Sequence, residues 1–167
     1  DSNGGQFDGT YNNESRYVRS LNFTVPSEAT RVEIVATITG HGFQQDDANC
    51  AEFCDHQHHY YMDSHHTYEW HPIVYSNTGC ENEVNNGVVA NQFGSWPFGR
   101  AGWCAGQDVK QWSFDITSWV DMNGQNNELT YRGLFNGQEY NPTGESSKGG
   151  RNIVAEIWVV FYTNSTA

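Results

Sequence analysis

The sequence has few basic residues, with 8 Lys and Arg against 20 Asp and Glu and a formal net charge of −12 at pH 7. A protein that binds a phosphate backbone or an anionic membrane surface needs a basic patch, so this balance excludes nucleic acid as a partner. The sequence also has no apolar run long enough to cross a bilayer, which excludes membrane insertion by a helix.

Charged residues make up only 17% of the chain, whereas aromatic residues make up 14%, with nine Tyr, nine Phe and six Trp. This composition excludes a disordered acidic tail and supplies the side chains of a core. A length of 167 residues suits one domain and is too short for two ordinary ones. We therefore expect one domain over residues 1–167. The start at Asp1, without an apolar leader, is typical of a processed segment.

Helical periodicity is also hard to find, and apolar residues alternate with polar ones instead. The alternation is clear over residues 31–38, 17–25 and 112–117, and residues 129–131 predict a short strand. Residues 153–162 are apolar on both faces except at Glu156, which predicts a central strand covered on each side. Turn-forming Gly and Asn residues lie between these segments, so the pattern predicts an antiparallel β-sandwich or jelly roll. Residues 41–106 are too many for one loop and should carry structure of their own.

Four cysteines and three glycosylation motifs indicate the compartment. Cys50 and Cys54 lie close enough for a tight disulfide loop or for half of a zinc site. Asn-x-Ser/Thr motifs, which accept N-linked glycans, occur at Asn13, Asn22 and Asn164. Paired cysteines and such motifs favour an oxidising, extracellular or secreted location.

Two motifs are specific because each consists of five residues in a set order: Cys50-Ala51-Glu52-Phe53-Cys54 and Arg100-Ala101-Gly102-Trp103-Cys104. With Gly79-Cys80 between them and His41 before them, they resemble the C-terminal domain of the peptide-N-glycosidase F family. The resemblance is strongest over residues 32–162. That family cleaves the amide between asparagine and the first sugar of an N-linked glycan.

The resemblance implies a single eight-stranded antiparallel jelly roll with a long loop region held by disulfides. The implied pairs are Cys50–Cys54 and Cys80–Cys104. The resemblance also gives Glu52 a place in the substrate cleft, where a rigidly held carboxylate suits a catalytic role on water or sugar hydroxyls.

The same resemblance implies three substrate-binding residues. Arg100 would hold a carbonyl through its planar fork, and Trp103 would stack on a sugar ring. His41 stands where the family has Trp and would form one wall of the cleft.

The family's principal catalytic acid lies on a separate N-terminal jelly roll, which has no counterpart among these residues. The resemblance therefore implies an amidase only if a partner domain is supplied, with an N-linked glycan or glycoprotein as substrate. It implies no cofactor. The alternative is a non-catalytic, glycosylated structural or adhesive subunit of an extracellular assembly that pairs with itself or with a second jelly roll.

Six of the seven histidines lie between positions 56 and 71. On a strand, His56 and His58 would share one face at two residue rises of ~3.3 Å, and His59 would point to the other face. A turn near Asp63 could fold the chain back and complete a copper or zinc site. The jelly rolls of copper-dependent, ascorbate-using monooxygenases show a more distant likeness, since they bind copper through a His-x-His pair. The candidate metal ligands are His56, His58, His65 and His66.

Overall fold

The structure is a computed structural model. It describes residues 2–7, 20–41, 56–69, 79–90, 96–99, 103–124, 126–135, 138 and 152–164. The strands within these ranges are β1 (Ser2–Phe7), β2 (Leu21–Phe23), β3 (Ala29–His41), β4 (His56–Met62), β5 (His65–Glu69), β6 (Trp112–Asp115), β7 (Asn127–Phe135) and β8 (Asn152–Thr163). A short 3₁₀ helix, η1, spans Glu81–Asn86. Among these ranges, no helix has the length and apolar character that crossing a membrane requires.

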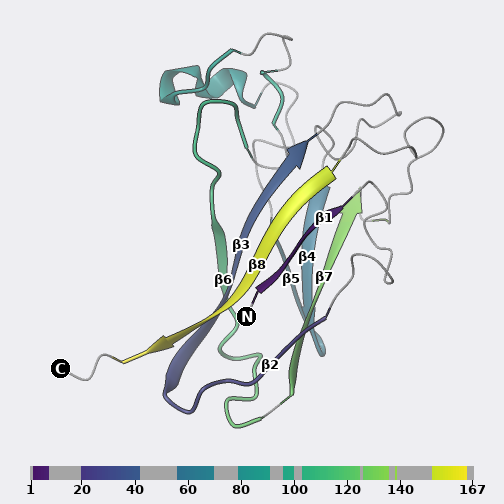
Figure 1. The fold of residues 1–167 in the computed structure, drawn as a ribbon, viewed down its shortest axis with the longest axis vertical. Helices are drawn as coiled ribbons and strands as arrows, with labels where there is room; N and C mark the ends of the chain where they lie inside the picture. The colour runs from purple at the N-terminus through teal and green to yellow at the C-terminus, as the bar shows by residue number, and fades with distance from the viewer. Residues whose placement is uncertain are drawn as a thin grey trace.

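The strands form two antiparallel sheets that pack as a sandwich (Figure 1). One sheet has the order β1-β8-β3-β6 and the other has the order β2-β7-β4-β5. The pairing is nested, since β1 pairs with β8, β2 with β7, β3 with β6 and β4 with β5. Such nesting arises when the chain folds as one long hairpin that then rolls up. The all-β sandwich predicted from the sequence is confirmed.

β3 shows how the sequence forms the core. Val32, Ile34 and Ile38 are at most 2% exposed and point between the sheets, whereas Glu33 and Thr37 lie on the outer face. The predicted alternation over residues 31–38 is therefore confirmed. Burial of each such aliphatic side chain stabilises the fold by roughly 1.5 to 3 kcal/mol. The opposing sheet contributes, among others, Tyr60, Leu129 and Tyr131 to the same core.

β8 is a central strand, between β1 and β3, as its apolar sequence predicted. The expectation that both its faces are covered is wrong for the described residues, because Val154 is 38% exposed and Trp158 is 43% exposed. Ala155, Ile157 and Val159 face the core instead. An antiparallel sheet in a sandwich buries one face and leaves the other to solvent, and here some outward residues are apolar.

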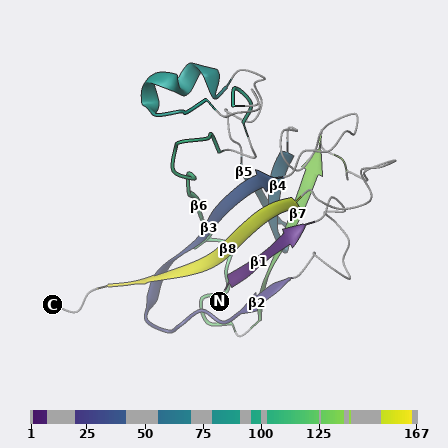
Figure 2. The same cartoon turned by 45° about the horizontal axis from the view of Figure 1, so that its top comes forward.

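One end of the sandwich gathers the termini of four strands. His41 at the end of β3 pairs with Asn152 at the start of β8, and His56 at the start of β4 pairs with Phe135 at the end of β7. The segment with η1 lies beyond this end of β3 in both views (Figure 1, Figure 2). β4, β5 and η1 all lie within residues 41–106, which confirms that this stretch carries structure of its own.

Candidate functional site

A disulfide fixes the segment that extends beyond β3. Cys80 and Cys104 are bonded, with their Cα atoms 5.6 Å apart, which confirms the pair implied by the resemblance. Both cysteines are buried with Val88 against the partly buried Trp96, so the segment has a small core of its own. Cys50 and Cys54 lie outside the described residues, and their pairing stays a prediction.

Backbone contacts hold the two sides of this segment together. The Val89 N–H donates to the Ala105 carbonyl at 2.8 Å, and the Cys80 N–H donates to the Pro97 carbonyl at 3.0 Å. Gly106 has φ +92°, and a Cβ atom there would lie 2.6 Å from the Gly87 carbonyl oxygen. Only glycine fits this turn without displacing the neighbouring backbone.

The structure brings two of the predicted substrate-binding residues together. The rings of His41 and Trp103 lie with their centroids 6.3 Å apart and their planes at 37°. The Trp103 Nε1–H donates to the Gln107 carbonyl at 3.0 Å, and His41 Nε2 lies 2.7 Å from the Thr39 hydroxyl. His41 is exposed and Trp103 is half-buried, so the pair lies at the surface of the sandwich end.

Glu52 and Arg100, the acid and the guanidinium of the predicted cleft, lie outside the described residues. Their convergence with Trp103 stays a prediction. Arg100 precedes Trp103 by three positions and Glu52 follows His41 by eleven, so both are joined to the described pair by short stretches of chain.

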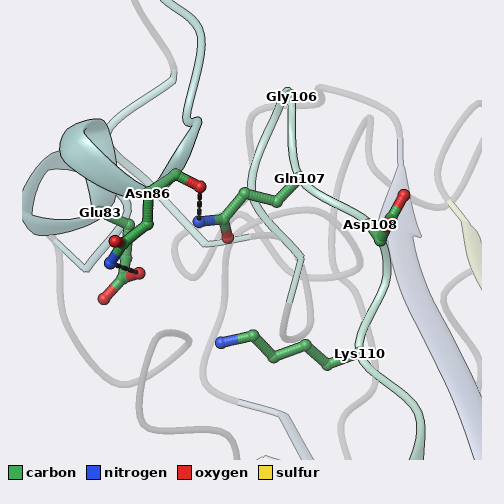
Figure 3. A pocket seen from close by; sticks show the side chains of 6 residues that line it. All are labelled: Glu83, Asn86, Gly106, Gln107, Asp108 and Lys110. Carbon is green, nitrogen blue, oxygen red and sulfur yellow. Dashed lines mark hydrogen bonds between the residues drawn. The ribbon is translucent and has the colours of Figure 1, made fainter.

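An open hollow of about 540 Å³ lies between η1 and the chain that leads to β6 (Figure 3), and one of its lining residues, Gln107, accepts the Trp103 indole hydrogen bond. Its lining residues are Glu83, Asn86, Gly106, Gln107, Asp108 and Lys110. The Asn86 side-chain amide donates to the Glu83 carboxylate at 2.8 Å, and the Gln107 amide donates to the Asn86 carbonyl at 3.2 Å. The Asn86 hydrogen bond lowers the pKa of Glu83, with smaller contributions from Gln107 and Lys110, so Glu83 is ionised at neutral pH.

Sequence reasoning missed the residues of this hollow. All but Gly106 are polar, they lie on η1 and in the connection that leads to β6, and they have no periodicity. The available signal was their spacing from the disulfide, because Glu83 follows Cys80 by three positions and Gln107 follows Cys104 by three.

Of the four predicted metal ligands, the three with described side chains, His58, His65 and His66, are not brought together. A two-residue turn at Asp63 and Ser64 closes the β4–β5 hairpin and pairs His65 with Met62 and His66 with Tyr61. His65 thus lies four residues from the register position of His58, or ~13 Å along the strand. His66 lies on the opposite face of the hairpin from His58.

The His56 side chain lies outside the described residues, and the register confirms that His58 and His59 face opposite sides. Within the described ranges, no group of three or more His, Cys, Asp or Glu side chains is placed to hold a metal ion. Copper or zinc binding stays a prediction, which elemental analysis of the native protein would check.

His58 instead belongs to a buried polar cluster on the inner face of β4, β5 and β7. Its Nδ1 lies 2.8 Å from the Tyr131 hydroxyl, and the Tyr60 hydroxyl donates to the Glu69 carboxylate at 3.1 Å. His58 is 1% exposed and Glu69 is fully buried. Burial first and the Glu69 carboxylate second raise the pKa of both tyrosines, so they stay neutral hydrogen-bonding groups.

The outer face of the hairpin carries a pair of histidines, His59 and His66. His59 Nδ1 lies 2.7 Å from His66 Nε2, and the two rings are nearly coplanar, at 5°. Tyr61 and Tyr68 pack against both rings. One imidazole must donate the proton that the other accepts, so the pair is favourable while at least one ring is neutral.

Acidification is expected to weaken the fold through His59. Burial, and then the neighbouring His66, lower the pKa of His59 below its ordinary value of 6.5. The unfolded chain then binds a proton more readily than the folded chain, so the free energy of unfolding falls as the pH drops through 6.5 and below. Urea denaturation at pH 7.5 and pH 5.0 measures the difference.

His59→Gln should reduce this pH dependence. His65→Gln is the matched control, because His65 lies on the other face and stacks on Trp119. Equal pH dependence in the parent chain and in His59→Gln would contradict the prediction.

Two of the predicted glycosylation sites lie within the described residues. Asn22 on β2 and Asn164 after β8 are both exposed, so each is accessible to a modifying enzyme. Asn13 lies outside the described residues.

Comparison with protein families gives one match that spans most of the chain. The family described as "Peptide-N-glycosidase F, C terminal" matches residues 10–160. A comparison with curated proteins gave no match.

Among solved structures, PNGase F, described as a glycosylasparaginase from Flavobacterium meningosepticum, is similar at 21% identity with a TM-score of 0.60. That match covers 87% of this chain and 44% of that chain. A structure described as a peptide-N(4)-(N-acetyl-β-D-glucosaminyl) asparagine amidase is similar at 18% identity with a TM-score of 0.58, covering 100% of this chain and 54% of that chain. At these identities the likeness shows the fold, and this chain spans about half the length of the matched structures.

Proposed function

Because the chain belongs to the peptide-N-glycosidase F C-terminal domain family, we propose that it binds N-linked glycans where His41 meets Trp103. The nested strand pairing supports a jelly roll, and this end of it gathers the ends of β3 and β7 and the starts of β4 and β8. The observation that carries the proposal is the placement of Trp103 against His41 by a disulfide-closed segment. An indole held in this way offers an apolar face to the C–H groups of a sugar ring.

The remaining residues of the cleft follow from the family. Arg100 orients the carbonyl of the glycosylated asparagine through its guanidinium fork. Glu52 positions a water molecule or a sugar hydroxyl. Amide cleavage needs a further catalytic acid from a partner domain, so this chain contributes the glycan-binding half of an amidase and requires no cofactor.

We further propose an extracellular location. The Cys80–Cys104 disulfide supports it, because such bonds persist in oxidising compartments. The exposed asparagines of two glycosylation motifs, Asn22 and Asn164, agree with the same location.

Calorimetric titration with a free N-linked glycan tests the binding proposal. Trp103→Ala is expected to weaken binding about tenfold, because one stacked aromatic ring contributes roughly this much. Trp158→Ala is the matched control, since Trp158 is an exposed indole on the outer face of β8.

Binding that Trp103→Ala leaves unchanged would contradict the proposed site, and no binding at all would contradict the function. Release of glycan from a denatured glycoprotein, with and without an added N-terminal family domain, separates binding from catalysis.

The second candidate function is a structural subunit of an extracellular assembly. The exposed Val154 and Trp158 on the outer face of β8 favour it, because exposed apolar side chains on one sheet face favour association. Size-exclusion chromatography over a range of concentrations discriminates, since an assembling subunit elutes earlier as its concentration rises.

A further inference from the structure

The hollow beside Trp103 is joined to the proposed glycan site by one residue. The Gln107 carbonyl accepts the Trp103 indole N–H at 3.0 Å, and its side-chain amide donates to the Asn86 carbonyl at 3.2 Å. The Gln107 backbone N–H also donates to the Cys104 carbonyl at 3.1 Å. Gln107 thus fixes the wall of the hollow to the indole, to the disulfide and to η1.

The lining of the hollow is rich in hydrogen-bond acceptors. The Asn86 amide donates one N–H to Glu83, the Gln107 amide donates one N–H to the Asn86 carbonyl, and each amide also carries an oxygen that accepts hydrogen bonds. Glu83 supplies carboxylate oxygens, Lys110 supplies an ammonium group that extends toward η1, and Asp108 also belongs to the lining (Figure 3). Vicinal hydroxyl groups suit such a lining, because they donate to a carboxylate and accept from an ammonium group.

The charge and the volume of the hollow further restrict the class of ligand that it would bind. Two carboxylates and one ammonium group give the lining a formal charge of −1, in a chain of net charge −12, so anionic ligands are disfavoured. A volume of about 540 Å³ falls within the range of small-molecule sites and is open enough for one end of a longer ligand.

We propose that this hollow is an outer subsite for a neutral sugar residue of the same glycan whose inner sugars lie at Trp103. The inference rests on the proposed function and adds a substrate class to it: neutral N-linked glycans over sialylated ones. The close packing of the Gly106 turn on Gly87 and Val89 supports this wall of the subsite before the ligand arrives, which reduces the entropy lost on binding.

Three ligands test the subsite on the full chain by calorimetric titration: N,N′-diacetylchitobiose, a neutral oligomannose N-glycan and a sialylated N-glycan. The parent chain is expected to bind the oligomannose glycan about tenfold more tightly than chitobiose, because two additional hydrogen bonds are worth roughly that factor. The sialylated glycan should bind more weakly than the oligomannose glycan.

The double variant Asp108→Ala/Lys110→Ala should lose the preference for oligomannose and keep the affinity for chitobiose. It removes one negative and one positive charge, so the net charge of the chain is unchanged. Glu81→Ala is the matched control, since Glu81 is an exposed carboxylate on the same 3₁₀ helix that does not line the hollow.

A double variant that keeps the full preference for oligomannose, or a parent chain without any preference, would overturn the subsite and leave the glycan site at Trp103 intact. A sialylated glycan that binds as tightly as the oligomannose glycan would contradict the proposed preference for neutral glycans. Failure of every glycan to bind overturns the proposed function, and the subsite with it.

Discussion

Replacement of Cys80 and Cys104 together by alanine is expected to lower the free energy of unfolding by about 3 kcal/mol. The bond closes a loop with a sequence separation of 24, and its removal allows the unfolded chain more conformations. The same change removes two of the three buried residues of the small core beside β3. Urea denaturation, followed by far-UV circular dichroism, measures the loss.

Loss of the disulfide should perturb the proposed glycan site at Trp103 more than it perturbs the strands of the sandwich. Trp103 adjoins Cys104, and its indole reaches Gln107 across the turn that the disulfide holds, so the His41–Trp103 contact should weaken in the double variant. Tryptophan fluorescence and glycan titration follow the site, and circular dichroism follows the strands. The double variant is preferable to reduction with dithiothreitol, which would also act on any Cys50–Cys54 bond. A loss below about 1 kcal/mol with the glycan affinity intact would contradict this account.

The core strands could be predicted from the sequence because their pattern is local. Over residues 31–38 of β3, apolar residues on the core side alternate with mostly polar residues on the outer side, and this period of two identifies the strand. The prediction that both faces of β8 are covered was wrong at Val154 and Trp158, which are apolar and exposed. Polarity alone does not distinguish an apolar residue that packs on the core from one that lies on the outer face.

The histidine-rich hairpin was predictable in part. A turn near Asp63 and the opposite orientations of His58 and His59 both follow from the sequence and are confirmed. The register could not be predicted, because the length of the turn sets it and a shift of one residue moves every side chain to the other face. The turn found here joins His59 to His66 and separates His58 from both His65 and His66.

The candidate site depended on resemblance and on the disulfide. Family motifs identified His41 and Trp103, which are 62 positions apart in the sequence, and the fold brings them into contact. The hollow was missed because its polar residues gather only when the disulfide brings η1 beside Gln107. Contacts between residues so far apart in the sequence do not appear in the local periodicity of either segment.

Truncation of Ile34 to alanine is expected to cost about 3 to 4 kcal/mol in the free energy of unfolding. Ile34 is fully buried at the middle of β3, where it pairs with Phe114 of β6 and Val159 of β8. The loss combines the transfer of buried methyl and methylene groups with the cavity that remains, and the two well-ordered neighbouring strands limit collapse around it. Equilibrium urea denaturation at pH 7.5 measures the change.

Thr37→Ala, on the same strand, is the matched control. Thr37 lies on the outer face, half-buried, opposite Glu156 of β8, and its truncation creates no core cavity. We expect a cost below about 1 kcal/mol, from lost strand propensity and cross-strand contact. Equal costs at the two positions would mean that β3 does not present Ile34 to the space between the sheets. The alternation along β3 would then no longer support a sandwich. The contact between His41 and Trp103, which depends on where this strand ends, would lose its structural basis as well.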